Sequence, residues 1–214
     1  MPSITKRNGR ASHRASAEER ILATTQRLLA GGTSFTELGL QRIAAEAGVA
    51  RSTLYGHFPD KSHLLTRLAG NMVGASFAAI APWTPDGPDG GLDGFIKLFR
   101  QVIRVYREHA AVLTALDEVS AYDAFVAEYW QSRLGQFVEN AERVLISEQR
   151  AGRAPASIDA AMASRLNVLG GHRFIACHVA TDDGSGDDSA ARELASTWWY
   201  GILRRPAPSS PPAA

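Results

Sequence analysis

The 214-residue sequence predicts an all-α protein of about nine helices, divided into a small N-terminal domain and a larger C-terminal one. Apolar residues recur every three or four positions along most of the chain, which is the period of an amphipathic helix. No segment alternates apolar and polar residues as a half-buried strand does. Glycines, prolines and capping residues separate the periodic segments, and no internal repeat is present.

The N-terminal elements are predicted from charge and capping residues. Residues 1–15 carry four Lys and Arg, no acidic residue and no apolar period, so we expect a disordered basic arm. Ser16 and Glu19 form a capping box that starts the first helix, and Gly31-Gly32 end it. Asp60 is expected to cap a long helix after a proline break. The later helices are predicted over about 40–47, 51–57, 60–81, 92–106, 110–119, 126–145, 159–180 and 189–204.

Loop composition completes the organisation of the chain. Residues 82–91 hold three prolines and three glycines, and residues 182–188 are acidic and glycine-rich, so both segments are expected to be loops. The Pro/Ser/Ala-rich tail over residues 206–214 is expected to be disordered. We therefore expect a DNA-binding domain over residues 16–65 and a second domain over residues 66–205.

Composition limits the classes of function. The hydrophobic fraction of 45% and charged fraction of 21% are ordinary for a globular protein. No apolar run is long enough to cross a membrane, and no signal segment follows the basic N-terminus. The single cysteine, Cys177, cannot form an intramolecular disulfide, which favours a cytoplasmic protein. We interpret Cys177 as a buried apolar residue in preference to a redox sensor.

Charge is distributed unevenly along the chain. Residues 1–70 contain ten Lys/Arg and five Asp/Glu, a net charge of +5, whereas residues 71–214 have a net charge of −4. A basic head on an acidic remainder is typical of a nucleic-acid-binding domain attached to an effector domain.

The block from Ile43 to Phe58 indicates a helix-turn-helix. Two short helices meet at Gly48, which can adopt the left-handed conformation that the turn requires. Val49 and Leu54 are spaced to pack between the two helices. The exposed face of the second helix then offers hydrogen-bonding side chains that can reach base edges and phosphates in a major groove. These side chains are Arg51, Ser52, Thr53, Tyr55 and His57. A plain helical hairpin with Tyr55 and Phe58 in its core is the alternative.

This block, extended through Lys61, resembles the DNA-binding domain of the TetR family of repressors, which carry a similar Ile-Ala…Ala-Gly-Val…Leu-Tyr-x-His-Phe-x-x-Lys run. The resemblance implies that Thr53, Tyr55, His57 and Lys61 contact DNA, with Arg51 and Ser52 at base-reading positions. It also implies a dimer on double-stranded palindromic operator DNA. Ala50 departs from the pattern, because the family commonly has a capping Ser or Thr there, worth about 1 kcal/mol.

The C-terminal half resembles the actinobacterial ethionamide-resistance-regulator branch of that family, through Glu148–Gly152 followed by Leu166-Asn167. The resemblance implies an aromatic-lined tunnel for a small apolar or aromatic effector. It places Trp130 and Asn167 on the tunnel wall, with Trp198 as a further candidate. Gly170 stands where a second asparagine is expected.

Independently of the resemblance, apolar residues on four predicted helices could converge on a pocket, although for any single one of them a packed core is the favoured interpretation. They are Phe95, Phe99, Tyr106, Phe125, Trp130, Leu134, Phe137 and Phe174. Gly170-Gly171 removes side-chain volume in mid-helix, at about 1 kcal/mol per glycine relative to alanine. Either a ligand pocket or a close helix–helix contact would account for that cost.

The last two helices are the expected dimer surface, with Trp198, Trp199, Ile202 and Leu203 contributing apolar area. Two other classes of function are alternatives. An enzyme is disfavoured because no nucleophile elbow, metal-ligand motif or phosphate loop occurs, and no cofactor or metal is expected. A DNA-binding protein tuned by a partner protein instead of a small molecule stays open.

Overall fold

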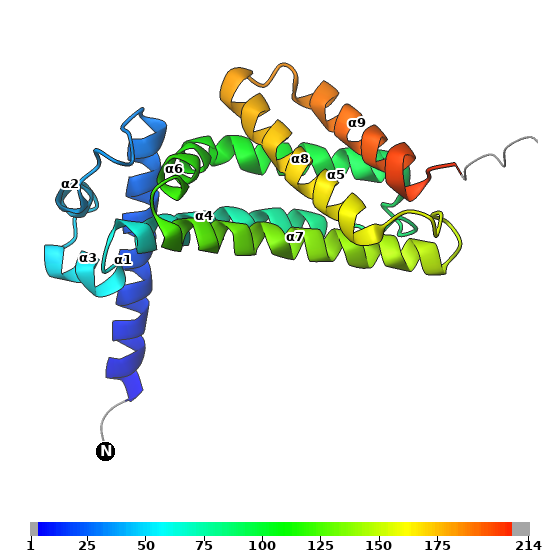
Figure 1. Ribbon diagram of the computed structural model, residues 1–214. Coiled ribbons are helices and arrows are strands. Elements are labelled where there is room, and N and C mark those ends of the chain that lie inside the picture. The colour runs from blue at the N-terminus through cyan, green and yellow to red at the C-terminus, as the bar shows by residue number, and fades with distance from the viewer. Residues whose placement is uncertain (1–3, 207–214) are drawn as a thin grey trace, which may run out of the picture. The chain divides into compact units, whose positions relative to one another are not determined.

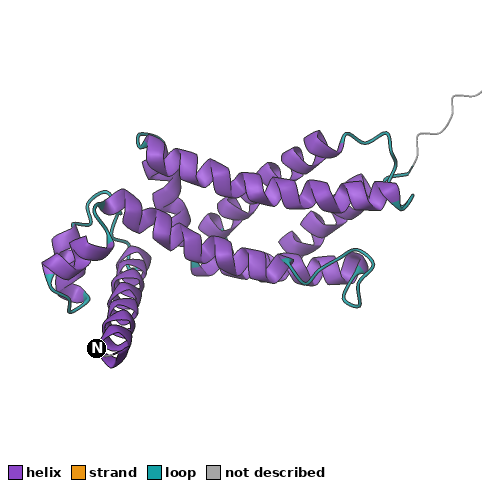
Figure 2. Ribbon diagram, turned by 90° about the horizontal axis from the view of Figure 1, so that it is seen from below, coloured by secondary structure: helices purple, strands orange, loops and turns teal. Residues whose placement is uncertain are grey.

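The computed structural model describes residues 4–206, with side chains described from residue 17. Every regular element in this part of the chain is a helix (Figure 2). The all-α prediction is confirmed. The helices labelled in Figure 1 are α1 (Ile4–Ala30), α2 (Leu40–Glu46), α3 (Arg51–His57), α4 (Lys61–Ile80), α5 (Gly91–Glu108), α6 (Ala110–Ser120), α7 (Ala124–Arg150), α8 (Ala160–Thr181) and α9 (Asp187–Trp198), the last continued by a π-helical segment, Trp199–Leu203.

The N-terminal end of α1 differs from the prediction. The helix begins at Ile4, whereas a disordered arm was expected up to residue 15 and a capped helix start at Ser16. Residues 4–15 contain one glycine and no proline, so no residue there forces the helix to end. Ser16 therefore lies inside α1 and does not begin the helix. The first three residues of the arm, and residues 207–214 of the tail, lie outside the described part of the chain.

Most helix boundaries follow from local residues. Gly32 has a φ of +86°, the left-handed conformation that ends a helix at low cost, and α1 stops at Ala30. Asp60 Oδ1 accepts a 2.9 Å hydrogen bond from the His63 amide at the start of α4. Asp159 Oδ1 accepts one of 3.0 Å from the Met162 amide at the start of α8. Both aspartates are N-caps, as the sequence predicts.

The chain forms two compact units. One comprises the described residues up to Met72 and His109–Trp130; the other comprises Val73–Glu108 and the described residues from Gln131 onward. The boundaries fall inside α4 and α7, so each of these helices contributes residues to both units. The single boundary expected after residue 65 differs from this division, because α6 and the start of α7 group with the N-terminal helices.

In the first unit, α1 packs against α2, α3 and α6, and α2 packs against α3. Its core consists of fully buried aliphatic side chains contributed by the helices and the α1–α2 loop. These are Ile21, Leu38, Ile43, Leu54, Leu64, Leu65 and Leu68. One side of α3 packs against this core, and the opposite side of α3 is exposed.

In the second unit, α5 packs against both α8 and α9, which also contact each other. The buried face of α5 carries an apolar residue at nearly every third or fourth position, and Ile103 on it is completely buried. The helices of this unit enclose a cavity, described below.

Candidate functional site

The α2–α3 pair has the geometry of the helix-turn-helix that the sequence predicts. Gly48 has a φ of +62°, and the Val49 amide donates to the Ala44 carbonyl at 3.0 Å across the turn. Ile43 on α2 and Leu54 on α3 are completely buried. The turn and these two side chains fix the direction of α3, so that one of its faces is presented outward.

Three of the predicted DNA-binding residues lie together on that exposed face. Arg51, Ser52 and Tyr55 are exposed, at positions i, i+1 and i+4 of the helix. The Arg51 guanidinium lies 5.5 Å from the centre of the Tyr55 ring, so the two side chains support each other. Thr53 is half-buried. The N-cap Ala50 provides no side-chain hydrogen bond, as expected from the sequence.

The other two predicted DNA-binding residues are engaged within the unit. The His57 side chain is 10% exposed, and its Nδ1 lies 3.8 Å from the Glu18 carboxylate of α1. Lys61 Nζ donates to the carbonyl oxygens of Phe35 at 2.5 Å and Thr36 at 2.9 Å. Burial lowers the pKa of Lys61. In this structure Lys61 fastens the start of α4 to the α1–α2 loop and presents no open ammonium group to a phosphate.

The second unit contains a cavity of about 130 Å³, lined by α4, α5, α7, α8, α9 and the π-helical segment. Six of the predicted ligand-binding residues line it: Phe95, Phe99, Tyr106, Leu134, Phe137 and Trp198. The ring centres of Phe95 and Phe99 are 4.9 Å apart, and the Trp198 ring meets both of them edge-on. No Lys, Arg, Asp or Glu lines the cavity.

The remaining five predicted ligand-binding residues do not line this cavity. Phe125 and Trp130 belong to the first unit, where Phe125 stacks on His63 at 4.7 Å and Trp130 is buried. Asn167 donates its amide to the Ala163 carbonyl of its own helix at 2.9 Å. Gly170 and Phe174 are exposed.

The reason for the difference on α8 is the rotation of that helix. Gly171, one position after Gly170 and about 100° further round the helix, is the buried glycine that lines the cavity. A Cβ built on Gly171 would lie 3.8 Å from the Trp198 ring, whereas nothing lies within 4 Å of a Cβ on Gly170. The glycine of α8 that leaves room for the cavity is therefore Gly171.

Sequence reasoning assigned Tyr106 to the pocket but not the other polar residues of the cavity wall. Tyr106 Oη and His172 Nδ1 lie 3.0 Å apart, and burial raises the pKa of Tyr106, which keeps its hydroxyl neutral. Ser76 on α4 is 2% exposed and also lines the cavity. A signal for Ser76 exists in the sequence, because it follows Ala69 and Met72 on the apolar stripe of its helix, where a hydroxyl is out of place.

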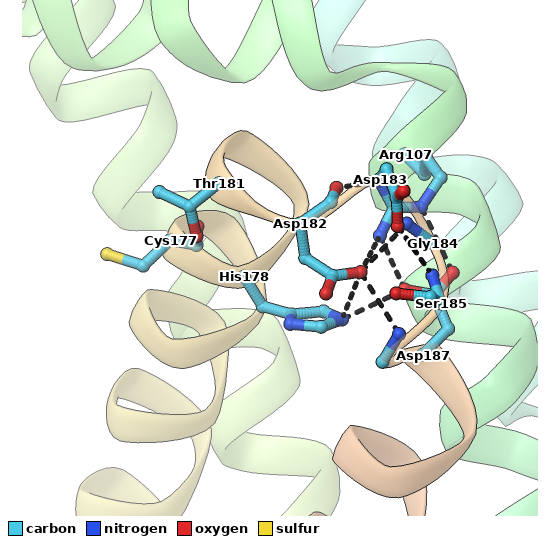
Figure 3. A network of polar contacts seen from close by, with 10 residues as sticks. Arg107, Cys177, His178, Thr181, Asp182, Asp183, Gly184, Ser185 and Asp187 are labelled. Atoms are coloured by element: carbon cyan, nitrogen blue, oxygen red, sulfur yellow. Dashed lines mark hydrogen bonds and ion pairs between the residues drawn. The ribbon is translucent and has the colours of Figure 1, made fainter.

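A polar cluster at the start of α9 closes the loop after α8 (Figure 3). Arg107 of α5 forms two hydrogen bonds to the Asp187 carboxylate, of 3.0 and 2.5 Å, and holds the pKa of Asp187 below its usual value. His178 Nε2 lies 2.9 Å from the same carboxylate, and Asp182 Oδ1 accepts from the Gly184 and Gly186 amides.

The donor atoms of His178, Asp182 and Asp187 lie close enough to one another to hold a metal ion. The Arg107 guanidinium pairs with both carboxylates of this group, so we interpret the group as an ion-pair clamp. The clamp fixes α9, and with it Trp198, against α5. Among the described residues no helix combines the length and the apolar character needed to cross a membrane.

Two family models match the chain. The model of bacterial regulatory proteins of the tetR family matches residues 21–68, and the model of the C-terminal domain of the transcriptional regulator EthR matches residues 96–203. The first range contains α2 and α3, and the second contains most of the cavity wall.

Similar proteins include the HTH-type transcriptional regulator EthR of Mycolicibacterium smegmatis, 26% identical over 205 residues, which are 91% of this chain and 93% of the relative. EthR of Mycobacterium tuberculosis H37Rv is 28% identical over 169 residues, 75% of this chain and 76% of the relative. Among solved structures, GusR of Salmonella enterica has a TM-score of 0.70 at 20% identity, covering 87% and 95% of the two chains. A transcriptional regulator from Saccharomonospora viridis, solved with choline, has a TM-score of 0.65 at 17% identity, covering 89% and 100%.

Proposed function

Because the chain belongs to the TetR family of transcriptional regulators, on the EthR branch, we propose that it is a dimeric repressor of palindromic operators that a small apolar effector releases. Members of these families are regulators and not enzymes, so the chain is a DNA-binding regulator. We propose that the protein acts in the cytoplasm, where its DNA target lies.

One observation carries the DNA-binding part of the proposal: Arg51, Ser52 and Tyr55 share the exposed face of a helix fixed by the Gly48 turn. A guanidinium can pair with a guanine edge, and hydroxyl groups can bond to bases or phosphates. Two such helices in a dimer would enter successive major grooves about 34–36 Å apart.

The dimer part rests on the exposed side of α8. Met162, Leu166, Leu169 and Phe174 lie on that side, and Leu166 is 73% exposed. A row of exposed apolar residues of this kind marks an interface. The residues expected from the sequence differ, because Ile202 and Leu203 are buried and Trp198 lines the cavity. We propose that α8 supplies the central contacts of an interface formed by the last two helices.

The effector part rests on the cavity. An aromatic wall without charged side chains favours a neutral ligand, since burying an unpaired charge is costly. Each buried methylene of such a ligand contributes about 0.8 kcal/mol. The effector would act by preferring the form of the protein that does not bind DNA. We propose that α4, which carries residues of both units, transmits the change.

The proposal is tested by titrating labelled palindromic DNA from upstream of the gene with wild type, Tyr55→Ala and Arg51→Ala. We expect Tyr55→Ala to weaken binding to all sequences and Arg51→Ala also to reduce the preference for operator over scrambled DNA. Tyr122→Ala is a matched control, because Tyr122 is an exposed tyrosine of the same unit that is not on α3. Operator affinity of Tyr55→Ala equal to wild type at matched salt would contradict the assignment of α3.

A further inference from the structure

The Ser76 hydroxyl lacks a hydrogen-bond partner although it is buried. The residue is 2% exposed, and its Oγ has no hydrogen-bond partner among the described residues. Helical Ser and Thr side chains often bond to the carbonyl four residues earlier, as Thr25 does to Ile21 at 2.7 Å. A buried hydroxyl that makes no such bond loses its hydrogen bonds to water without replacing them, which costs free energy. A ligand from outside the chain could supply the missing hydrogen bond.

The unpartnered groups are concentrated at the cavity. Among the described residues three buried side-chain polar atoms have no partner, and two of them, Ser76 Oγ and Trp83 Nε1, belong to residues that line it. A Cβ built on Gly94 would lie 3.4 Å from Trp83 Nε1, so the backbone of α5 partly covers this nitrogen.

Other polar groups of the wall already have partners. Tyr106 Oη and His172 Nδ1 are 3.0 Å apart, and Asn140 Oδ1 accepts from Arg143 at 3.2 Å. Asn167, the polar group that the sequence suggested, is bonded within α8 and lies off the cavity. Compared with these groups, the Ser76 hydroxyl on α4 is a polar group of the wall that has no partner.

We propose that Ser76 is the polar anchor of the cavity, and that its ligand is a neutral compound with a single aromatic ring and a hydrogen-bond acceptor such as a carbonyl. This rests on the proposed effector function of the cavity. The size argument comes from the volume of about 130 Å³, which is close to that of a cavity of about 150 Å³ that binds benzene in another protein. Absence of a cationic side chain from the wall disfavours a carboxylate.

The test uses two probes of nearly equal shape, acetophenone and α-methylstyrene, in which a carbonyl oxygen replaces a methylene carbon. Equilibrium dialysis gives the Kd of each probe for wild type, Ser76→Ala and Tyr106→Phe. The two probes differ in hydration, but that difference is common to all three proteins and cancels. We expect Ser76→Ala to reduce the preference for acetophenone about fivefold, the worth of one neutral hydrogen bond. Tyr106→Phe should leave the preference unchanged.

The ligand-free protein provides a second readout. Ser76→Ala removes a hydroxyl without a partner, so its Tm should rise above that of wild type. A lower Tm would show that the hydroxyl is already satisfied and would overturn the proposal.

The outcomes separate the anchor from the effector function. If both probes bind but Ser76→Ala keeps the wild-type preference, or if Tyr106→Phe alone removes it, the anchor is not Ser76 while the cavity remains a ligand site. If neither probe binds wild type, the anchor and the effector function of the cavity both fall.

Discussion

Glu148 shows how one buried charge can fasten the end of a long helix. Its side chain is 3% exposed, and its carboxylate accepts hydrogen bonds from Arg153 at 2.6 and 3.0 Å and from Arg204 at 2.7 Å. The hydrogen bonds from Arg153 are the main reason why its pKa is lowered. The neighbouring Gln149 donates hydrogen bonds from Nε2 to the carbonyl oxygens of Pro155 and Ile158. These bonds explain, in physical terms, why the Glu-Gln-Arg-Ala-Gly segment occurs at the end of α7.

We predict that Glu148→Gln lowers the free energy of unfolding at pH 7 by about 2 kcal/mol, because charge-assisted hydrogen bonds are replaced by weaker ones. The lowered pKa also sets the pH dependence: the wild-type advantage is complete above the unfolded value of 4.5 and declines as the pH falls below it. Urea unfolding at pH 7 and at pH 3.5 measures both effects. If the difference in free energy of unfolding between wild type and Glu148→Gln is as large at pH 3.5 as at pH 7, this account is wrong.

Ala50 is a second residue whose effect can be isolated. It begins α3 with extended backbone angles, φ −64° and ψ 145°, and has no side-chain oxygen to accept an amide of the first turn. We predict that Ala50→Ser stabilises the protein by about 1 kcal/mol, as an N-cap does, and raises the Tm. Ala50→Val, with a side chain of similar size and no oxygen, should not. Equal Tm values for the two variants would argue against capping.

At the scale of elements, α8 has two apolar sides. Gly171, Ile175 and Val179 are buried in the second unit, while Met162, Leu166 and Phe174 are exposed on the other side. The exposed apolar residues of α8 are interspersed with exposed arginines, and exposed apolar patches of this kind mark interfaces. This arrangement is the element-scale reason for proposing a second copy there.

We predict that Leu166→Arg converts the dimer into a monomer, because a charge at the centre of an apolar interface is left unpaired. Sedimentation velocity at several concentrations measures the change, and circular dichroism verifies the fold. Gln101→Arg adds the same charge at an exposed position of α5 and should leave the dimer intact. A folded Leu166→Arg dimer would place the interface elsewhere.

How far the sequence predicts the structure also depends on the element. The bounds of α3 and the turn at Gly48 agree with the prediction, since glycine conformation and core spacing there are local. The cavity face of α8 was not, because apolar residues on both sides give the period no preferred direction. Gly170 and Phe174 were therefore assigned to the wrong side. Lys61 shows a third case, in which the residue that pattern matching assigns to DNA bonds to nearby carbonyls.

At the scale of the whole molecule, the cavity and α3 are linked in the chain by α4, which has Lys61 at one end and Ser76 near the other. An effector changes DNA affinity only to the extent that it binds one conformation more tightly. Shifting the populations from about 1:99 to 99:1 takes about 5.5 kcal/mol of differential binding.

We predict that Gly171→Leu fills part of the cavity, lowers the affinity for acetophenone at least tenfold and weakens operator binding without effector. The Cβ itself is accommodated, since its nearest neighbours lie 3.8–3.9 Å away. Gly135→Leu is the control: Gly135 is on α7, off the cavity wall, with open space at its Cβ. Dialysis and DNA titration measure the two effects. Unchanged operator affinity in a Gly171→Leu protein that no longer binds the probe would separate the cavity from DNA binding.

The cavity has a mechanical consequence as well. Its volume of about 130 Å³ corresponds to about 80 mL per mole of empty space, within the range by which unfolding typically shrinks a protein under pressure. Hydrostatic pressure therefore acts on this fold in part through the cavity of the second unit. A bound ring occupies that space, so the liganded protein gains less volume advantage from unfolding and withstands compression better than the free protein.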